Sequence, residues 1–164
     1  MIAIRPATAS DAETIAAIYV DSWNAGFEGL MPARRLTAEL VVRWGRALAM
    51  PLPHRWWVAA VDDEIAGFAG IRPSRDPPDP TLGELDTIAM APPWWRCGIG
   101  RALMTTALRH LQSDGYREAV LWTLANYARG GRFYEAMGWQ LDGGVRDEGR
   151  QIRYRYRCPD ASRV

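Results

Sequence analysis

The chain has 164 residues, of which 48% are hydrophobic and 24% are charged, a composition typical of one globular domain. Its 20 basic and 19 acidic residues leave a net charge of +1, so we expect no broad electrostatic capture of nucleic acid or of an anionic membrane. All the basic residues are arginines, which excludes a lysine Schiff base and a phosphate-binding loop that ends in lysine. We see neither a signal peptide nor an apolar run of membrane-spanning length, so a cytoplasmic location is expected.

Capping residues and turn residues divide the first half of the chain into elements. Ser10 and Glu13 have the spacing of a helix capping box, and Thr37 is a typical N-cap residue. Two β-rich runs that flank the acidic residues 62–64 are typical of an antiparallel hairpin. In chain order we predict a strand over 2–5, and then a helix that begins at the capping box over 10–13 and ends near Gly26 or Gly29. A helix from Thr37 that ends before Pro51 follows, and then strands over 56–61 and 65–71.

Prolines and glycines mark the boundaries in the second half. Four prolines between residues 73 and 80 predict a loop, and Pro92-Pro93 ends the strand that follows it. Gly98-Ile99-Gly100 then opens a helix that stops at Gly115. The other predicted elements are strands over 84–90 and 118–124, a helix over 128–137, and strands over 139–141 and 151–157. This order predicts a single mixed α/β domain over residues 1–158, followed by a short tail over 159–164.

The turn before the predicted helix at Ile99 has the features of an anion site. A helix N-terminus presents successive backbone N–H groups, and its macrodipole favours negative charge. Gly98 and Gly100 allow a ligand to approach the backbone closely, and Arg96 and Arg101 would add charge-assisted contacts to a diphosphate. The spacing lacks the third glycine of a dinucleotide-binding turn and the Gly-Lys-Ser/Thr of a nucleoside triphosphate loop. A helix start without a ligand remains the alternative.

The chain contains two further motifs, Met90-Ala91-Pro92 ahead of the glycine turn, and Phe133-Tyr134-Glu135-Ala136-Met137-Gly138-Trp139. They resemble motifs of the GNAT superfamily of N-acetyltransferases, which use acetyl-coenzyme A. In that family a strand ends in hydrophobic-x-Pro and is followed by Arg or Gln-x-x-Gly-x-Gly or Ala, whose amides hold the pyrophosphate of coenzyme A. Met90-Ala91-Pro92 and Gly98-Ile99-Gly100 fit this pattern. The later family motif, Phe-Tyr-Glu-x-x-Gly-Phe or Trp, is similar to residues 133–139. The resemblance covers nearly the whole chain.

The resemblance implies a three-layer α/β/α fold of the GNAT type, with a mixed and mostly antiparallel sheet of about seven strands. A splayed pair of strands in that sheet should hold the arm of the acyl donor, acetyl-coenzyme A, and no metal is expected. The residues that the resemblance places at the donor are Ile88, Ala89, Met90, Trp95, Arg96, Cys97, Gly98, Ile99, Gly100, Arg101, Asn126 and Tyr127.

The chain departs from the family pattern at two places. Trp95 and Arg96 stand where the family has Arg or Gln and then Gly, so an indole replaces one side chain expected near the phosphates. Tyr127 aligns with the family asparagine, with Asn126 one place earlier, which puts a hydrogen bond to the pantetheine arm in question. These departures motivate an alternative to catalysis, in which a module of the same fold binds coenzyme A or a partner without transfer.

The implied reaction is direct attack of a neutral amine on the thioester, and it needs a base, an oxyanion donor and an acid. An alkylammonium has a pKa near 10.4, so a carboxylate, acting directly or through water, is the natural base. Glu84 and Asp86, two apart on one strand, are the candidates and should share one face of the sheet. A strand amide near Ala89 or Met90 would meet the oxyanion, and Tyr134 matches the family tyrosine that protonates the departing thiolate.

The acceptor is an amine that the sequence does not specify further. Aromatic walls suit a cation or an apolar substrate, and a small amine, an amino acid, an antibiotic and a protein N-terminus all remain open, as does a homodimer. Arginine and tyrosine alternate over 151–157, but a strand would place them on opposite faces, so RNA binding is not expected. The candidate acceptor-binding residues are Trp23, Phe27, Trp44 and Tyr154.

Overall fold

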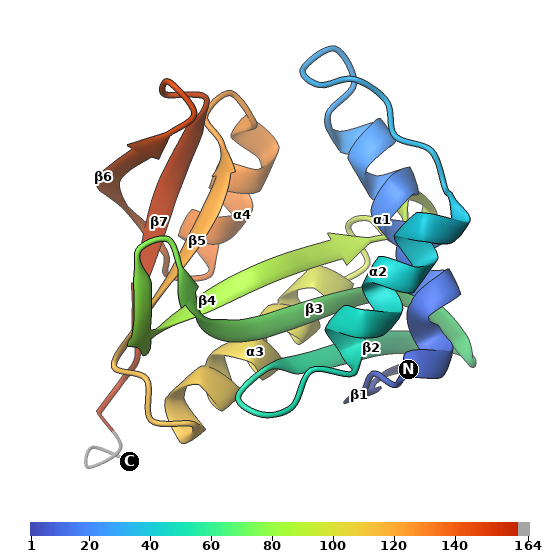
Figure 1. Ribbon diagram of the computed structural model, residues 1–164, viewed down its shortest axis with the longest axis horizontal. Coiled ribbons are helices and arrows are strands. Elements are labelled where there is room, and N and C mark those ends of the chain that lie inside the picture. Colours follow the sequence, from blue (N-terminus) through green and yellow to red (C-terminus); the bar gives the residue numbers. More distant parts are fainter. Residues whose placement is uncertain (161–164) are drawn as a thin grey trace.

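A seven-stranded sheet in the order β1-β2-β3-β4-β5-β7-β6 crosses the computed structural model, which describes residues 1–160 (Figure 1). Neighbouring strands are antiparallel except β4 and β5, which are parallel. The strands are β1 (Ile2–Pro6), β2 (Arg55–Val61), β3 (Glu64–Arg75), β4 (Pro78–Met90), β5 (Glu118–Leu124), β6 (Gln140–Arg146) and β7 (Gln151–Arg157). The helices are α1 (Ala12–Gly26), α2 (Ala38–Leu48), α3 (Ile99–Ser113) and α4 (Ala128–Ala136), with 3₁₀ turns η1 (Ala9–Asp11) and η2 (Pro92–Trp94).

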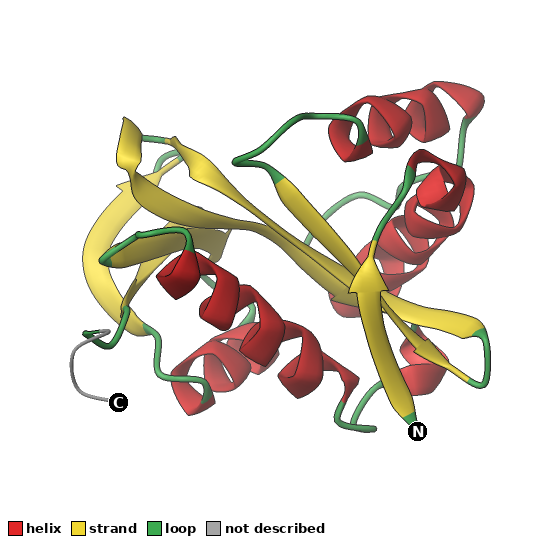
Figure 2. Ribbon diagram, turned by 90° about the horizontal axis from the view of Figure 1, so that it is seen from below, coloured by secondary structure: helices red, strands yellow, loops and turns green. Residues whose placement is uncertain are grey.

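Helices cover both faces of the sheet, which confirms the predicted α/β/α layers (Figure 2). Alternate residues of a strand point to opposite faces, so neighbouring tryptophans of β2 enter different cores. Trp56 packs with α1 and α2, whereas Trp57 packs with α3. The apolar face of α3 is fully buried at Leu103 and Ala107, four residues apart, which accounts for the helical period of its sequence.

The β4–β5 pair opens into a gap, as the resemblance implied. Only two residue pairs join these strands, Gly83 with Ala119 and Glu84 with Val120. Just beyond these pairs, the register between β3 and β4 shifts. Leu85 pairs with Ile71 and Thr87 pairs with Gly70, so Asp86 has no partner on β3, which is the geometry of a β-bulge. A bulge bends its strand and increases its twist, so β4 leaves β5 from this point on.

The predicted proline loop is wrong, because β3 and β4 continue through it as a tight hairpin. Ser74 pairs with Asp79 and Arg75 with Pro78, so only Asp76 and Pro77 form the turn. The pairing between β2 and β3 extends only to Arg55 opposite Ile71, so residues 72–75 of β3 have no β2 neighbour. A strand with a free edge tolerates proline, which explains why the prolines do not break it.

Two other boundaries differ from the prediction. The capping box belongs to Thr8 and Asp11 rather than to Ser10 and Glu13: the Asp11 carboxylate accepts the Thr8 backbone N–H over 2.8 Å. β6 runs to Arg146 and is longer than the predicted strand. Of the predicted tail, residues 161–164 lie outside the described residues. No helix within residues 1–160 combines the length and the apolar character that a membrane span requires.

Candidate active site

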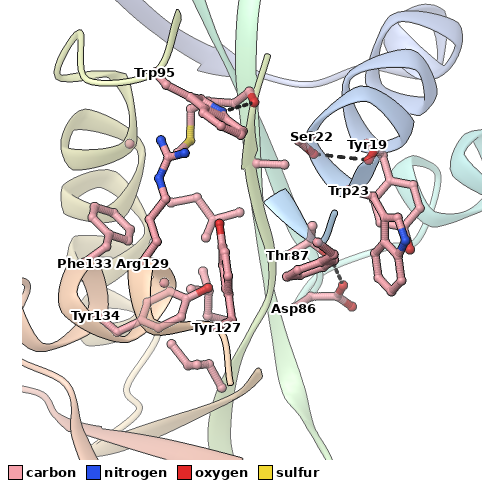
Figure 3. Close-up of a pocket in the computed structure, with 18 of the residues that line it drawn as sticks. Tyr19, Ser22, Trp23, Asp86, Thr87, Trp95, Tyr127, Arg129, Phe133 and Tyr134 are labelled. Carbon is pink, nitrogen blue, oxygen red and sulfur yellow. Dashed lines mark hydrogen bonds between the residues drawn. The ribbon is translucent and has the colours of Figure 1, made fainter. Parts of the chain in front are cut away.

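A cavity of about 650 Å³ occupies the gap between β4 and β5 (Figure 3). Its walls are β4 residues 85–90, the N-terminal ends of α3 and α4, and the C-terminal half of α1. It brings together most of the residues predicted at the donor, namely Ile88, Ala89, Met90, Trp95, Arg96, Gly98, Gly100, Arg101 and Tyr127.

The first turn of α3 leaves backbone donors free at this cavity. The first backbone hydrogen bond of the helix joins the Ala102 N–H to the Gly98 carbonyl over 3.1 Å, so the N–H groups of residues 99–101 have no acceptor within the helix. Gly98, the N-cap residue, has φ +82°, a conformation that favours glycine. A Cβ on Gly100 would lie 3.0 Å from the Met90 methyl carbon. The turn therefore forms an anion cradle that added side-chain atoms would distort or crowd.

Cys97 and Asn126 lie outside the cavity lining, contrary to the prediction. Both side chains are exposed, although their neighbours Gly98 and Tyr127 line the cavity. The Ile99 side chain is buried in the core under α3, with 1% of its surface exposed, so only its backbone N–H belongs to the cradle.

The free edge of β4 supplies a second set of backbone groups. In an antiparallel ladder, alternate residues bond to the neighbouring strand. The Ala91 N–H donates to Ala66 of β3, and two residues earlier Ala89 pairs with Phe68, so the backbone groups of Ala89 face β3. Those of Ile88 and Met90 face the gap, so of the two expected oxyanion donors, Ala89 and Met90, it is the Met90 N–H that points toward the gap.

Trp95 lies at the cavity rim and is held from two sides. Its Nε1–H donates to the Met90 carbonyl over 2.8 Å. The guanidinium carbon of Arg129, from the first turn of α4, lies 3.7 Å from the indole ring centroid, in the geometry of a cation–π contact (Figure 3). Sequence reasoning missed Arg129, because no local pattern brings the start of α4 next to residue 95.

Tyr134 lines the cavity from α4, as the resemblance implied. Burial raises the pKa of its phenol well above its usual value, and the neighbouring Tyr127 raises it further. The Tyr134 hydroxyl therefore stays protonated at neutral pH, so it can donate a proton or a hydrogen bond to a substrate atom. Its ring packs on Phe133 and on Tyr154, with centroid distances of 5.7 Å and 5.6 Å, so these neighbours hold its orientation.

Glu84 and Asp86 share one partner, the buried guanidinium of Arg72, which confirms that they lie on one side of the sheet. Only Asp86 lines the cavity; Glu84 is 4% exposed and lies outside the lining. Burial raises the pKa of Glu84, and the charge of Arg72 opposes that shift. Thr87 donates to the Asp86 carboxylate over 2.7 Å. The bulge therefore turns one of the two carboxylates toward the space where a substrate would lie.

The acceptor end of the cavity is aromatic. Trp23 and Phe27 line it as predicted, together with Tyr19, which sits one turn before Trp23 on the same helix. Phe27 contacts Tyr127 across the gap, edge to face, with centroids 4.8 Å apart. Hydrophobic spacing alone could have suggested Tyr19, but it equally fits a core position.

Trp44 and Tyr154 are wrong as acceptor-binding residues. Trp44 is 9% exposed and packs on Trp56 and Phe68 in the core beneath α2. Tyr154 is 3% exposed and lies behind Tyr134, outside the lining of the main cavity. Aromatic residues on an amphipathic face pack in a core as readily as in a pocket, which explains both errors.

The arginines of β7 are paired with carboxylates. Arg153 and Arg155 both donate to Asp142, and Arg155 and Arg157 both pair with Glu118. These two carboxylates offset part of the positive charge of the strand, and the expectation of no RNA binding stays a prediction.

Comparison with known proteins decides the family. Residues 13–139 match the model of the acetyltransferase (GNAT) family, which is more than half of the chain. The chain belongs to this family. It is therefore an acyltransferase, with acetyl-coenzyme A as the acyl donor.

Curated relatives and solved structures agree with this assignment. An uncharacterized N-acetyltransferase of Bacillus subtilis, YuaI, is 28% identical over 132 residues, which cover 76% of this chain and 72% of the relative. A mycothiol acetyltransferase of Frankia casuarinae is 28% identical over 94 residues, 53% of this chain but only 27% of that protein. The PaiA N-acetyltransferase of Thermoplasma acidophilum, solved in complex with coenzyme A, superposes with a TM-score of 0.77 at 19% identity, covering 96% of this chain and 99% of the other. An N-acetyltransferase of Staphylococcus aureus gives 0.79 at 18%, with 97% and 99% covered.

The residues present fit this donor. The cradle at Gly98 presents unpaired N–H groups where a diphosphate needs them, and the gap beside β4 exposes the backbone of Ile88 and Met90 to an extended amide-bearing arm. Arg96 and Arg101 line the same cavity and add positive charge.

Proposed function

We propose that the protein transfers the acetyl group of acetyl-coenzyme A to a primary amine by direct attack. The observation that carries this proposal is the single cavity that runs from the anion cradle at α3 to the aromatic pocket at the end of α1. A donor in the gap and an amine in the pocket would meet beside β4, with no intervening wall. Direct transfer needs this arrangement, because both substrates must be present at once.

Each reacting group has a residue of the chain beside it. When bound, acetyl-coenzyme A supplies an activated thioester carbonyl. The Met90 N–H, aimed into the gap, is placed to stabilise negative charge on that carbonyl oxygen. Tyr134, kept protonated by burial, donates to the departing sulfur. Asp86 accepts the proton of the amine, directly or through water, because it is the carboxylate that reaches the cavity.

The acceptor class follows from the walls of the pocket. Tyr19, Trp23 and Phe27 present aromatic faces, and Asp86 adds one carboxylate at the inner end. Arg34 already lies over the Trp23 ring at 3.8 Å and over the Tyr19 ring at 5.4 Å. The aromatic walls therefore suit an apolar or aromatic body rather than a second cation, while the Asp86 carboxylate positions an ammonium group, so the pocket suits an amine with such a body. A free amino terminus of a protein and a small amine both meet this description.

Two measurements test the proposal. Thermal unfolding with acetyl-coenzyme A, coenzyme A and ATP should show stabilisation by the first two alone, since binding to the folded state raises the melting temperature. Thiol release should then be followed with a panel of aromatic amines, aliphatic amines and peptides. Release above the rate of hydrolysis with any of them supports direct transfer. Release that is independent of every amine, together with an acetylated enzyme detected by mass spectrometry, would contradict it.

A further inference from the structure

We infer that Arg129 binds the diphosphate of the donor, and that the indole of Trp95 is the platform that positions it. This inference rests on the proposed function. It concerns two residues that depart from, or lie outside, the motifs that carried the assignment.

The first observation is the rigidity of the platform. Trp95 is anchored by its hydrogen bond to the Met90 carbonyl, over 2.8 Å, and this carbonyl belongs to the free edge of β4. An indole fixed at its nitrogen keeps one face toward the cavity. Arg129 lies over that face at 3.7 Å, and planar guanidinium groups stack well on tryptophan.

The second observation is that Arg129 has spare hydrogen-bonding capacity. Among residues 1–160 its side chain has neither an ion-pair partner nor a hydrogen-bond acceptor, although it lines the cavity. By contrast, Arg146, which also lines the cavity, is paired with Asp76 and Gln151. A guanidinium carries five N–H donors in a fixed fork that matches phosphate oxygens. Stacking on Trp95 orients Arg129 without using any of these donors.

The third observation is the position of this pair relative to the anion cradle. Trp95 lies three residues before Gly98, and a Cβ on Gly100 would lie 3.4 Å from Phe133, one turn beyond Arg129 on α4. The start of α4 therefore faces the free N–H groups of α3, and Figure 3 shows Arg129 extending from α4 toward Trp95. The family pattern has Arg or Gln at the position of Trp95. This chain carries an indole there, and Arg129, which stacks on the indole, supplies the positive charge from α4 on the opposite wall of the cavity.

Calorimetric titration with coenzyme A and with dephospho-coenzyme A, together with steady-state kinetics on S-acetylpantetheine, tests the inference on purified, folded protein. Arg129→Ala should weaken coenzyme A binding about tenfold or more, which is the loss expected for charge-assisted hydrogen bonds. The same loss should appear with dephospho-coenzyme A, which retains the diphosphate and lacks the 3′-phosphate. The KM for S-acetylpantetheine, which has no diphosphate, should stay within twofold of the wild type. Arg132→Ala is the matched control, because Arg132 is exposed one turn further along α4 and lies outside this cavity.

The role of Trp95 is read from a double-variant cycle. Trp95→Phe keeps an aromatic face and loses the Nε1 donor, so we expect a loss of coenzyme A affinity smaller than that of Trp95→Ala. Arg129→Ala should cost less in the Trp95→Ala background than in the wild type, since an unplaced arginine contributes less. Additive losses would overturn the platform role, and thermal unfolding without ligand checks that each variant folds.

The outcomes separate the two proposals. Wild-type protein that binds no coenzyme A would contradict the proposed function itself. Wild-type protein that binds it while Arg129→Ala binds within twofold would overturn the inference alone. A loss that disappears with dephospho-coenzyme A would assign Arg129 to the 3′-phosphate and would overturn the diphosphate assignment.

Discussion

Phe27, directly after α1, packs edge to face on Tyr127, directly before α4, with ring centroids 4.8 Å apart. This contact joins the α1 side of the molecule to the part that follows β5, across the mouth of the gap in the sheet. Both residues line the cavity. In the proposed function the contact therefore lies between the donor site and the acceptor site, although neither residue carries a charge.

Phe27→Ala should raise the KM for the amine about tenfold, because the proposed acceptor would lose a ring to pack on, and an aromatic contact contributes up to about 1.5 kcal/mol. Affinity for acetyl-coenzyme A should change less, since the cradle at α3 is untouched. Steady-state kinetics with each substrate varied in turn measures both effects. A larger effect on the donor than on the amine would show that Phe27 serves the donor arm.

Gly100→Glu should weaken acetyl-coenzyme A binding at least tenfold. Its Cβ would crowd the Met90 methyl group at 3.0 Å, and its carboxylate would repel a diphosphate at the cradle. Gly45→Ala is the matched control: it adds a Cβ inside α2, where the nearest atom is 3.9 Å away, and should leave affinity unchanged. Equal affinities for the donor in all three proteins would exclude the cradle as the diphosphate site.

Tyr134→Phe should lower kcat by about 100-fold while donor affinity stays within twofold, because the hydroxyl acts on the leaving group and not on the bound ground state. Tyr116→Phe, which removes a buried phenol near the end of α3, is the control for loss of a hydroxyl elsewhere in the fold. Unchanged turnover in the first variant would remove Tyr134 from the mechanism.

Asp86→Asn and Glu84→Gln should affect different quantities. Asp86→Asn should lower kcat/KM for the amine by about 100-fold, since the proposed base is lost, and it also costs some stability because Asp86 is a partner of Arg72. Glu84→Gln should act mainly on stability, with a loss of about 3 kcal/mol, because it leaves part of the buried Arg72 charge uncompensated. Chemical denaturation and initial rates separate the two. The reverse outcome would make Glu84 the base.

Asp11 should make a pH-dependent contribution to stability. Arg5 donates to both of its carboxylate oxygens over 2.9 Å and lowers the pKa of Asp11 to about 2. A carboxylate with a lowered pKa in the folded state stabilises the fold above its unfolded pKa and loses that contribution as the pH falls toward the folded pKa. Asp11→Asn should therefore cost about 2 kcal/mol at pH 7, and the difference should vanish between about pH 4 and pH 2. A difference that stays constant across this range would exclude the ion pair as its source.

Local signals predicted well where one residue type has one dominant use. Gly98 and Gly100 marked a helix start that opens onto the cavity, and Tyr134 was found through a motif that fixes its place in α4. Signals failed where a residue type serves two purposes. Trp44 and Trp23 both belong to amphipathic helices, and only the packing of α2 over Trp56 makes the first a core residue.

Contacts between distant segments could not be predicted at all. The prolines at 73–80 read as a loop because sequence does not reveal that β2 ends early and leaves part of β3 with a free edge. The stack of Arg129 on Trp95 likewise depends on how α4 meets the start of α3, which the tertiary fold alone determines.

The gap between β4 and β5 also affects which substitutions this chain can accept while still binding its donor. A hydrogen bond offered by the main chain is independent of the side chain above it, so Ile88 and Met90 should be replaceable by other apolar residues that pack against the core and keep the strand extended. Proline is the exception, since it alone removes the N–H. Mutational tolerance beside the gap should consequently be set by core packing and backbone geometry, the opposite of a site built from charged groups.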